Sequence, residues 1–364
     1  MFVGEGALVA IRALAGTNVA VIHAPSIERD PSLLDQINRA IAAPTVRHFR
    51  WSGGEPTIDI IVALSAQLRE QRPDVVVAVG GGSVIDAARA AWLLYEYPSI
   101  DLSQSGARIA VPRLRGLARF AAVPTTAGAG AEVSSAVVLT NTAGSKVILV
   151  SGEFLPDIVI LDPRTSAGVP ASLFRQSLGD VLSHVVEGHC SRVVNPFVGE
   201  MTRQLFPRLW QTFTAQAGTA DELLSSDQRL LMMQHALQAG WIQNHRPPGL
   251  GHAVSHALAN VQVPHAVAAG LCLAPSLRVN LEHQGTRAAL EDLGSTVGLP
   301  SAEALIDRID STMRAIQSIT PSIRARIGER TEALVSAALA DVTARTNPIP
   351  VHPAMVEQVL EDLP

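Results

Sequence analysis

The sequence predicts a protein of two parts, an N-terminal α/β domain with a parallel sheet and a C-terminal domain that is all-helical. Two runs rich in β-branched residues, at 18–23 and 74–79, are typical of strands that are buried on both faces. Helical patterns at 57–71 and 84–95 alternate with them, as they do in parallel βαβ units. From about residue 171 the apolar residues recur with helical periodicity instead.

Three further apolar runs continue the series of expected strands, at 120–123, 136–139 and 158–161. The pattern changes after them, in the Pro-containing stretch 162–170. We therefore expect a boundary there, with domains at 1–165 and 166–364. A length of 364 residues fits a chain of about two domains.

Composition narrows the class of protein. With 47% hydrophobic residues the chain can bury a large core, while a net charge of −5 without a basic patch argues against nucleic acid as a partner. No apolar run approaches the roughly 20 residues that span a bilayer, and the N-terminus lacks the pattern of a signal peptide. Cys190 and Cys272 make neither a disulfide framework nor a metal motif. We expect a cytoplasmic, globular protein that binds neither membranes nor nucleic acid.

A glycine-rich turn follows the expected strand at 74–79. Gly80, Gly81 and Gly82 allow the backbone to approach a phosphate closely. Ser83 with Asp86 is expected to form a capping box at the start of the next helix, whose dipole would face the anion. The turn matches neither G-x-G-x-x-G nor a Walker loop, so by itself it is weak evidence for nucleotide binding.

The next turn carries small residues and hydroxyls as well. It follows the apolar run 120–123 and contains Thr125, Thr126 and Ser134. Loops at the carboxyl ends of parallel strands meet at one edge of the sheet. The two turns are therefore expected to line one crevice.

One carboxylate and three histidines in the second half have the spacing of a divalent-metal site. Asp180 and His184 stand four apart, so on a helix they project from one face. His252 and His256 repeat this spacing, and His265 follows a proline at the expected opening of another helix. One carboxylate with three imidazoles suits Fe²⁺, Zn²⁺, Co²⁺ or Mn²⁺. The alternative is a set of unrelated histidines, although seven of the 11 lie between 184 and 265.

Lys146 is the only lysine among 28 Lys and Arg residues. Lysine is a compact charge that can lose its proton when buried, whereas arginine is a planar fork that stays charged. We therefore interpret Lys146 as chemically required, the alternative being a lysine that merely persists in an Arg-rich composition.

Taken together and in order, these motifs resemble the iron-dependent (group III) alcohol dehydrogenase family. The resemblance runs from about residue 74 to 350 and rests on Gly-Gly-Gly-Ser-x-x-Asp at 80–86, Pro-Thr-Thr-Ala-Gly at 124–128 with Glu132, Lys146, the Asp-Pro pair at 162–163, Asp180-x₃-His184-x₂-Glu187, His252-x₃-His256, His265 and Thr-Asn-Pro at 346–348.

The resemblance implies a dinucleotide-binding domain followed by a helical metal-binding domain, an architecture shared with dehydroquinate synthase. It assigns the metal to Asp180, His184, His252 and His265. It assigns the cofactor pyrophosphate to the turn 80–83, with Asp86 in the same motif, and the rest of the cofactor to Thr125, Thr126, Ser134 and Lys146. His256 would lie near the nicotinamide and the substrate. His256 and Lys146 are the expected catalytic residues, with a water chain as the alternative route for the proton.

The expected activity is hydride transfer between a nicotinamide and a small alcohol, aldehyde or ketone that a metal activates. Fe²⁺ is the expected metal, with Zn²⁺ or another divalent ion possible, and a homodimer is possible. The strand 18–23 ends in His23-Ala24-Pro25, where NAD-dependent members often have an aspartate, so NAD and NADP both stay open.

Two alternatives remain at this stage. One is a sugar-phosphate cyclase-type lyase of the dehydroquinate synthase class, against which a single lysine weighs, because such an enzyme must hold a substrate phosphate. The other is a non-catalytic metal- or nucleotide-binding homologue.

Overall fold

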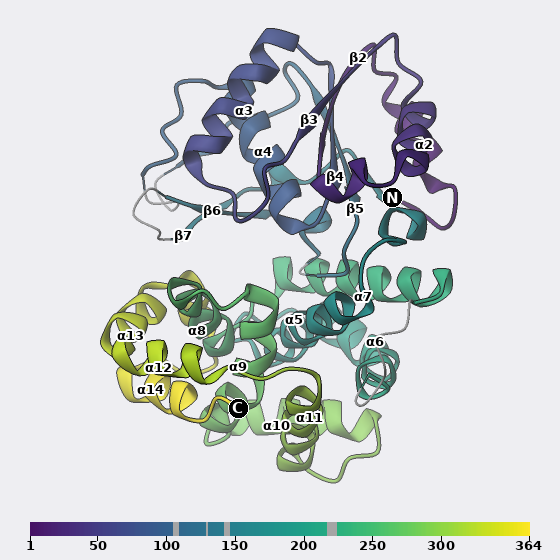
Figure 1. The fold of residues 1–364 in the computed structure, drawn as a ribbon. Helices are drawn as coiled ribbons and strands as arrows, with labels where there is room; N and C mark the ends of the chain where they lie inside the picture. Colours follow the sequence, from purple (N-terminus) through teal and green to yellow (C-terminus); the bar gives the residue numbers. More distant parts are fainter. Residues whose placement is uncertain (105–108, 129, 142–145, 217–223) are drawn as a thin grey trace. The chain divides into compact units, whose positions relative to one another are not determined.

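The computed structural model describes residues 1–104, 109–128, 130–141, 146–216 and 224–364, which form two compact units (Figure 1). The first unit comprises residues 1–170 and 223–237, and the second comprises 171–222 and 238–364. The first is α/β and the second is helical, as the sequence predicts.

The first unit is built on a parallel sheet of six strands in the order β1-β8-β5-β4-β2-β3. The expected strands are all present, and each lies within a residue or two of its predicted position. Three described strands have no counterpart in the prediction: β1, which has only two residues, the edge strand β3, whose sequence Thr-Val-Arg-His-Phe-Arg is largely polar, and β7 (Lys146–Val150). The strands are β1 (Phe2–Val3), β2 (Asn18–His23), β3 (Thr45–Arg50), β4 (Val75–Gly80), β5 (Arg119–Pro124) and β8 (Ile158–Leu161).

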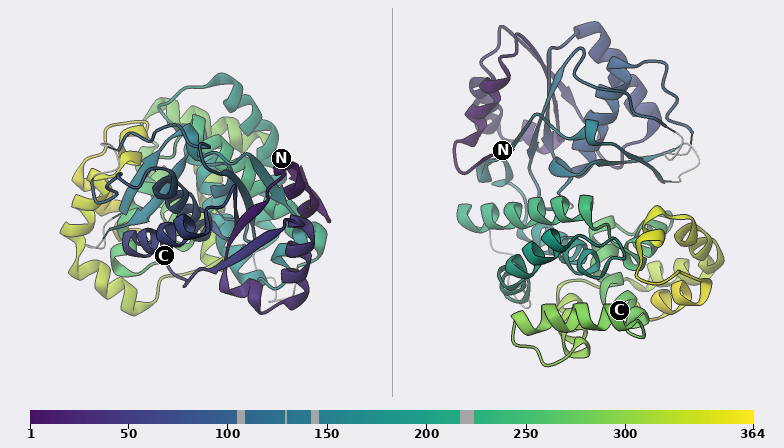
Figure 2. Two further views of the ribbon diagram at one scale, coloured as in Figure 1. Left: turned by 90° about the horizontal axis from the view of Figure 1, so that it is seen from above. Right: turned by 180° about the vertical axis from the view of Figure 1, so that it is seen from behind.

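Alternate residues of the central strands face two separate hydrophobic cores. In β2, Ala20 and Ile22 contribute to the core under α3 (Ile58–Gln71) and α4 (Gly82–Glu96), while Val19 and Val21 contribute to the other. That second core is covered by the 3₁₀ segment η1 (Ala7–Leu14) and by α2 (Pro31–Ile41). Figures 1 and 2 show α2 on one face of the sheet and α3 with α4 on the other. The unbroken apolar runs thus result from burial on both faces.

The apolar run at 136–139 is a strand, but it lies outside the parallel sheet. It forms β6 (Ala136–Thr140), which pairs antiparallel with β7 (Lys146–Val150). The Thr140 amide donates a hydrogen bond to the Pro56 carbonyl (2.8 Å), which ties this hairpin to the segment before α3. Lys146 is the first residue of β7.

The second unit contains no strand among its described residues. Its helices are α5 (Ala171–Cys190), α6 (Pro196–Thr214), the C-terminal part of α7 (Ser226–His245), α8 (Leu250–Leu258), α9 (His265–Asn280), α10 (Gln284–Thr296), α11 (Ala302–Ile316), α12 (Pro321–Glu329), α13 (Thr331–Ala340) and α14 (Pro353–Glu361). No helix in the described part of the chain is both long and apolar enough to cross a membrane.

Helices α5 and α9 approach each other at a pair of glycines. A Cβ atom added at Gly179 would lie 2.9 Å from the Gly270 Cα atom, and one added at Gly270 would lie 2.5 Å from the Met313 Cε atom. Only glycine fits such a close approach without moving a neighbour. Since Asp180 follows Gly179 and α9 begins at His265, this contact brings the two helices that carry these residues together.

Candidate metal centre

Three histidine nitrogens surround one carboxylate oxygen in the helical unit. Asp180 Oδ1 lies 3.5 Å from His184 Nδ1, 3.5 Å from His252 Nε2 and 3.6 Å from His265 Nε2. Asp180, His184 and His252 are buried, while the side chain of His265 is 35% exposed. The four residues that the sequence singles out as metal ligands are therefore brought together, with one of them open to solvent.

Local sequence explains the placement of each of these side chains. Asp180 and His184 are one turn apart on α5, as their spacing predicts. His252 lies in the first turn of the short helix α8. His265 opens α9 directly after Pro264, the N-cap residue, in agreement with the expected helix start.

Buried atoms at the centre of this cluster have no hydrogen-bond partner among the described residues. They are Asp180 Oδ1, His184 Nδ1 and His252 Nε2. A buried polar atom is normally satisfied, so three such atoms that face one another need an explanation. These same three residues offer ligand atoms that all lie within 4.8 Å of one another. A divalent cation at this point would satisfy all three, so the donor set fits a metal.

The ionisable groups of the cluster shift one another's pKa values strongly. Burial alone would raise the pKa of Asp180, but the surrounding histidines, His184 foremost, lower it well below its usual range. Burial lowers the pKa of His184 to about 3, although Asp180 opposes this. For His252, burial is outweighed by Asp180 and Glu187, which raise its pKa to about 9. Without a metal the cluster thus contains an ionised carboxylate, a neutral imidazole and an imidazole, His252, that must lose a proton before its Nε2 atom can bind a metal.

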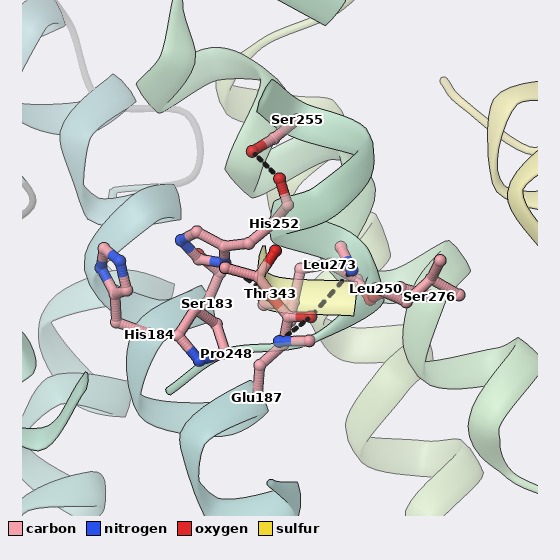
Figure 3. A network of polar contacts seen from close by, with 12 residues as sticks. Ser183, His184, Glu187, Pro248, Leu250, His252, Ser255, Leu273, Ser276 and Thr343 are labelled. Carbon is pink, nitrogen blue, oxygen red and sulfur yellow. Dashed lines mark hydrogen bonds and ion pairs between the residues drawn. The ribbon is translucent and has the colours of Figure 1, made fainter. Parts of the chain in front are cut away.

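Glu187 contacts both His252 and the start of α8, a role that sequence reasoning did not assign. Its Oε2 atom accepts a hydrogen bond from His252 Nδ1 (2.6 Å), and its Oε1 atom accepts from the amides of Gly249 (3.2 Å) and Gly251 (2.8 Å). Figure 3 shows Glu187 directed from α5 toward His252 and the first turn of α8. The signal in the sequence was its position in the Asp-x₃-His-x₂-Glu motif.

His256 lies one helical turn beyond His252 and is held by a carboxylate that sequence reasoning missed. Its Nδ1 atom lies 2.9 Å from Asp341 Oδ2, and its ring stacks on that of His265 with centroids 5.1 Å apart. Asp341 also accepts hydrogen bonds from the amide and hydroxyl of Thr343. Burial would raise the pKa of Asp341, but His256 and Thr343 lower it overall. No local pattern connects residues 85 positions apart.

In the first unit, the glycine turn joins β4 directly to α4. Gly80 ends the strand, Gly81 is the N-cap residue and Gly82 begins the helix. The expected capping box is wrong, because α4 starts two residues earlier than this motif requires, with Gly81 rather than Ser83 as its N-cap residue. Ser83 is consequently the second helical residue, and the side chain of Asp86 instead accepts a hydrogen bond from the Val138 amide (3.1 Å).

The second turn lies against the glycines. The Thr125 amide donates to the Gly80 carbonyl (3.0 Å), and a Cβ atom added at Gly81 would lie 3.0 Å from Thr126 Oγ1. The two turns thus meet at the carboxyl ends of β4 and β5, as the sequence predicts. The hydroxyl of Ser134 does not face the glycine turn in the same way, because its Oγ atom accepts a hydrogen bond from the Ala136 amide (3.1 Å).

Two of the charged residues that the sequence singles out, Lys146 and Asp86, form ion pairs. Lys146 pairs with Glu55 and lies 3.3 Å from Thr140 Oγ1. Asp86 is buried, and its Oδ1 atom lies 3.7 Å from Nη1 of the fully buried Arg89. The Arg89 guanidinium also donates a hydrogen bond to the Ala131 carbonyl. Asp86 therefore supports the segment that carries the second turn.

Comparison with known proteins identifies the family. The family description "Iron-containing alcohol dehydrogenase" matches residues 1–163, and "Fe-containing alcohol dehydrogenase family, C-terminal" matches residues 176–363. The chain belongs to the iron-containing alcohol dehydrogenases. The resemblance inferred from the ordered motifs is therefore confirmed.

Relatives in this family align over most of the chain. The 1-propanol dehydrogenase PduQ of Salmonella typhimurium is 29% identical over 100% of this chain and 97% of its own length. The probable alcohol dehydrogenase EutG of the same organism is 31% identical over 85% of this chain and 78% of its own length. The solved structure of an iron-containing alcohol dehydrogenase from Thermococcus thioreducens superposes with a TM-score of 0.89 at 25% identity, covering 100% of this chain and 97% of that one.

Membership in the iron-containing alcohol dehydrogenases confirms the predicted class of activity. The chain is an oxidoreductase that acts on CH–OH groups, and a metal-dependent, NAD(P)-linked alcohol dehydrogenase at the level of its family. Neither the lyase of the dehydroquinate synthase class nor a non-catalytic homologue gains support from the comparisons.

Proposed function

We propose that this enzyme interconverts a small alcohol and its aldehyde or ketone at a divalent metal held by Asp180, His184, His252 and His265. The observation that carries the proposal is the set of three buried ligand atoms that face one another in the helical unit and have no hydrogen-bond partner among the residues that the structure describes. Iron is the metal that we favour, because the family is named for it. Zn²⁺ offers the same ligand preferences and is the alternative.

The metal, when bound, supplies Lewis acidity that favours the alkoxide form of an alcohol and polarises a carbonyl. The chain's own residues do the rest. Asp180 contributes the negative charge of the site, and burial keeps His184 neutral, the form that can act as a ligand. The 35% exposure of His265 leaves that side of the site accessible to a small substrate.

His256 is the proposed proton carrier, and Asp341 is proposed to position it. A carboxylate can only accept a hydrogen bond, so the 2.9 Å contact places a proton on His256 Nδ1 and leaves Nε2 for exchange with the substrate. Stacking against His265 holds the ring beside a proposed metal ligand. This geometry favours His256 over a chain of water molecules.

The nicotinamide cofactor is proposed to bind to the first unit. Its pyrophosphate would lie on the turn formed by Gly80, Gly81, Gly82 and Ser83, where no N-cap side chain competes for the first amides of α4. Thr126 lies against this turn and would contact the cofactor directly, whereas Thr125 is buried and would act through its amide's hydrogen bond to the Gly80 carbonyl. Further along the cofactor we place Ser134, Asp86 and Lys146, of which Ser134 and Asp86 would act indirectly because they are buried.

The pairing of Lys146 with Glu55 and Thr140 supports a role in holding the edge of this cofactor site. The choice between NAD and NADP stays open. The domain boundary at 165/166, the homodimer and the cytoplasmic location remain predictions.

The test is nicotinamide absorbance with anaerobically Fe²⁺-loaded protein, NAD or NADP, and a panel of small alcohols and aldehydes. We expect activity that depends on the metal, and its loss in His184→Ala. His352→Ala is the matched control, because His352 is exposed at the start of α14. Full activity of His184→Ala, or activity in wild-type protein from which the metal has been removed, would overturn the proposal.

A further inference from the structure

We propose that Glu187 is a positioning residue that selects the tautomer of His252 and thereby sets the affinity of the site for its metal. The inference rests on the proposed function, since it takes His252 as a metal ligand. Glu187 would touch neither substrate nor metal and would act only through the imidazole.

The hydrogen bond between the two side chains decides which nitrogen of His252 carries the proton. Glu187 Oε2 lies 2.6 Å from His252 Nδ1, and a carboxylate can only accept. The Nδ1 atom must therefore carry hydrogen. In the neutral ring this leaves the lone pair on Nε2, the atom that faces Asp180 Oδ1 at 3.5 Å.

The other carboxylate oxygen of Glu187 fixes the backbone that carries the ring. Oε1 accepts from the amides of Gly249 and Gly251, at the N-terminal end of α8. A Cβ atom added at Gly251 would lie 3.0 Å from this oxygen, so glycine is needed for the approach. One buried carboxylate thus sets both the position of the His252 backbone and the orientation of its ring (Figure 3).

The variant Glu187→Gln distinguishes a role in hydrogen bonding from a role that depends only on the volume of the side chain. It has almost the same shape but one acceptor oxygen and an NH₂ group. If the NH₂ faces Gly249 and Gly251, it meets two further donors. If it faces His252, Nδ1 must become the acceptor, and the proton moves to Nε2 and blocks the metal-binding atom. Loss of such a partner typically weakens metal binding by about 10- to 100-fold.

The experiment measures metal affinity rather than turnover. Full-length metal-free protein is titrated with Co²⁺, followed by visible absorbance, and with Zn²⁺ in competition with a chelator. The variants are Glu187→Gln, His252→Ala and the double variant, with Glu357→Gln as the matched control because Glu357 is exposed on α14. Thermal unfolding of each metal-free protein reports its structural integrity.

We expect Glu187→Gln to bind both metals about 10- to 100-fold more weakly than wild type and Glu357→Gln to bind normally. In the His252→Ala background, Glu187→Gln should add almost nothing, because the residue through which it acts is absent. A merely structural role would instead give the same further loss in both backgrounds.

Affinity of Glu187→Gln within about two-fold of wild type, or additive losses in the double variant, would overturn the inference. Should Glu187→Gln fail to fold, Glu187→Asp replaces it, because its shorter side chain cannot reach both the amides and the ring. The same two outcomes, an affinity within about two-fold of wild type or additive losses in the double variant, would then overturn the inference. Wild-type protein that binds neither metal would instead refute the proposed function, so the two failures are distinguishable.

Discussion

Replacing Asp86 by asparagine should change how the stability of the protein depends on pH. Burial is the strongest influence on this carboxyl and raises its pKa from 3.8 to about 6, although Arg89 and the Val138 amide oppose it. The folded protein therefore binds the proton more tightly than the unfolded chain. The stabilisation that results from this tighter proton binding is fully present below about pH 4 and is lost as the pH rises to about 6. Above that pH it does not change further. A shift of about two pKa units corresponds to roughly 3 kcal/mol.

The assay is thermal unfolding of wild type and Asp86→Asn between about pH 4 and pH 8. Wild type should lose stability relative to the variant as the pH rises, and the difference between their midpoints should change by roughly 5 to 10 °C for an energy of this size. The exposed Asp59, replaced in the same way, serves as control and should show no such change. Parallel curves for wild type and Asp86→Asn would refute the reasoning, because they would mean that Asp86 titrates alike in the folded and unfolded chains.

Two further changes test the helical unit. Gly270→Ala places a Cβ atom 2.5 Å from Met313 Cε and should destabilise the metal-free protein by about 1–3 kcal/mol. The control is Gly328→Ala, whose Cβ atom meets no described atom within 4 Å and should not change the stability. Equal unfolding midpoints for the two variants would show that the helices accommodate the added Cβ atom without loss of stability. Asp341→Asn should lower kcat about ten-fold or more at unchanged metal content, because it removes the carboxylate that orients the His256 ring. Steady-state kinetics together with metal analysis measure both quantities. An unaltered kcat would mean that the orientation of His256 is unimportant.

Local spacing explains why so much of the metal cluster could be anticipated. The separation of Asp180 and His184 fixes their common face on any helix, and a histidine after proline marks a helix start. Buried strands such as β2 are equally visible, because burial on both faces demands an unbroken apolar run. The edge strand β3 escaped prediction because only one of its residues, Phe49, is buried and the others meet solvent wholly or in part.

What could not be predicted depends on contacts between distant segments. Asp341 and His256 are 85 positions apart, and nothing near either residue indicates the other. The capping box at 83–86 failed for a related reason. Asp86 had a better partner in the Val138 amide of β6, which becomes a neighbour only after the sheet and hairpin form.

The Asp-x₃-His-x₂-Glu pattern places its three side chains at positions i, i+4 and i+7, and therefore along one face of α5. Asp180 and Glu187 are then separated by seven residues of helix, roughly 10 Å along the axis. An imidazole that lies between them offers one nitrogen to each carboxylate, and His252 does so, with Nε2 toward Asp180 and Nδ1 toward Glu187. The two contacts have opposite requirements, because Glu187 needs a hydrogen on Nδ1 while a metal beside Asp180 needs a lone pair on Nε2. A neutral histidine meets both requirements in one tautomer only, so the spacing on α5 dictates the chemical form of a residue on α8.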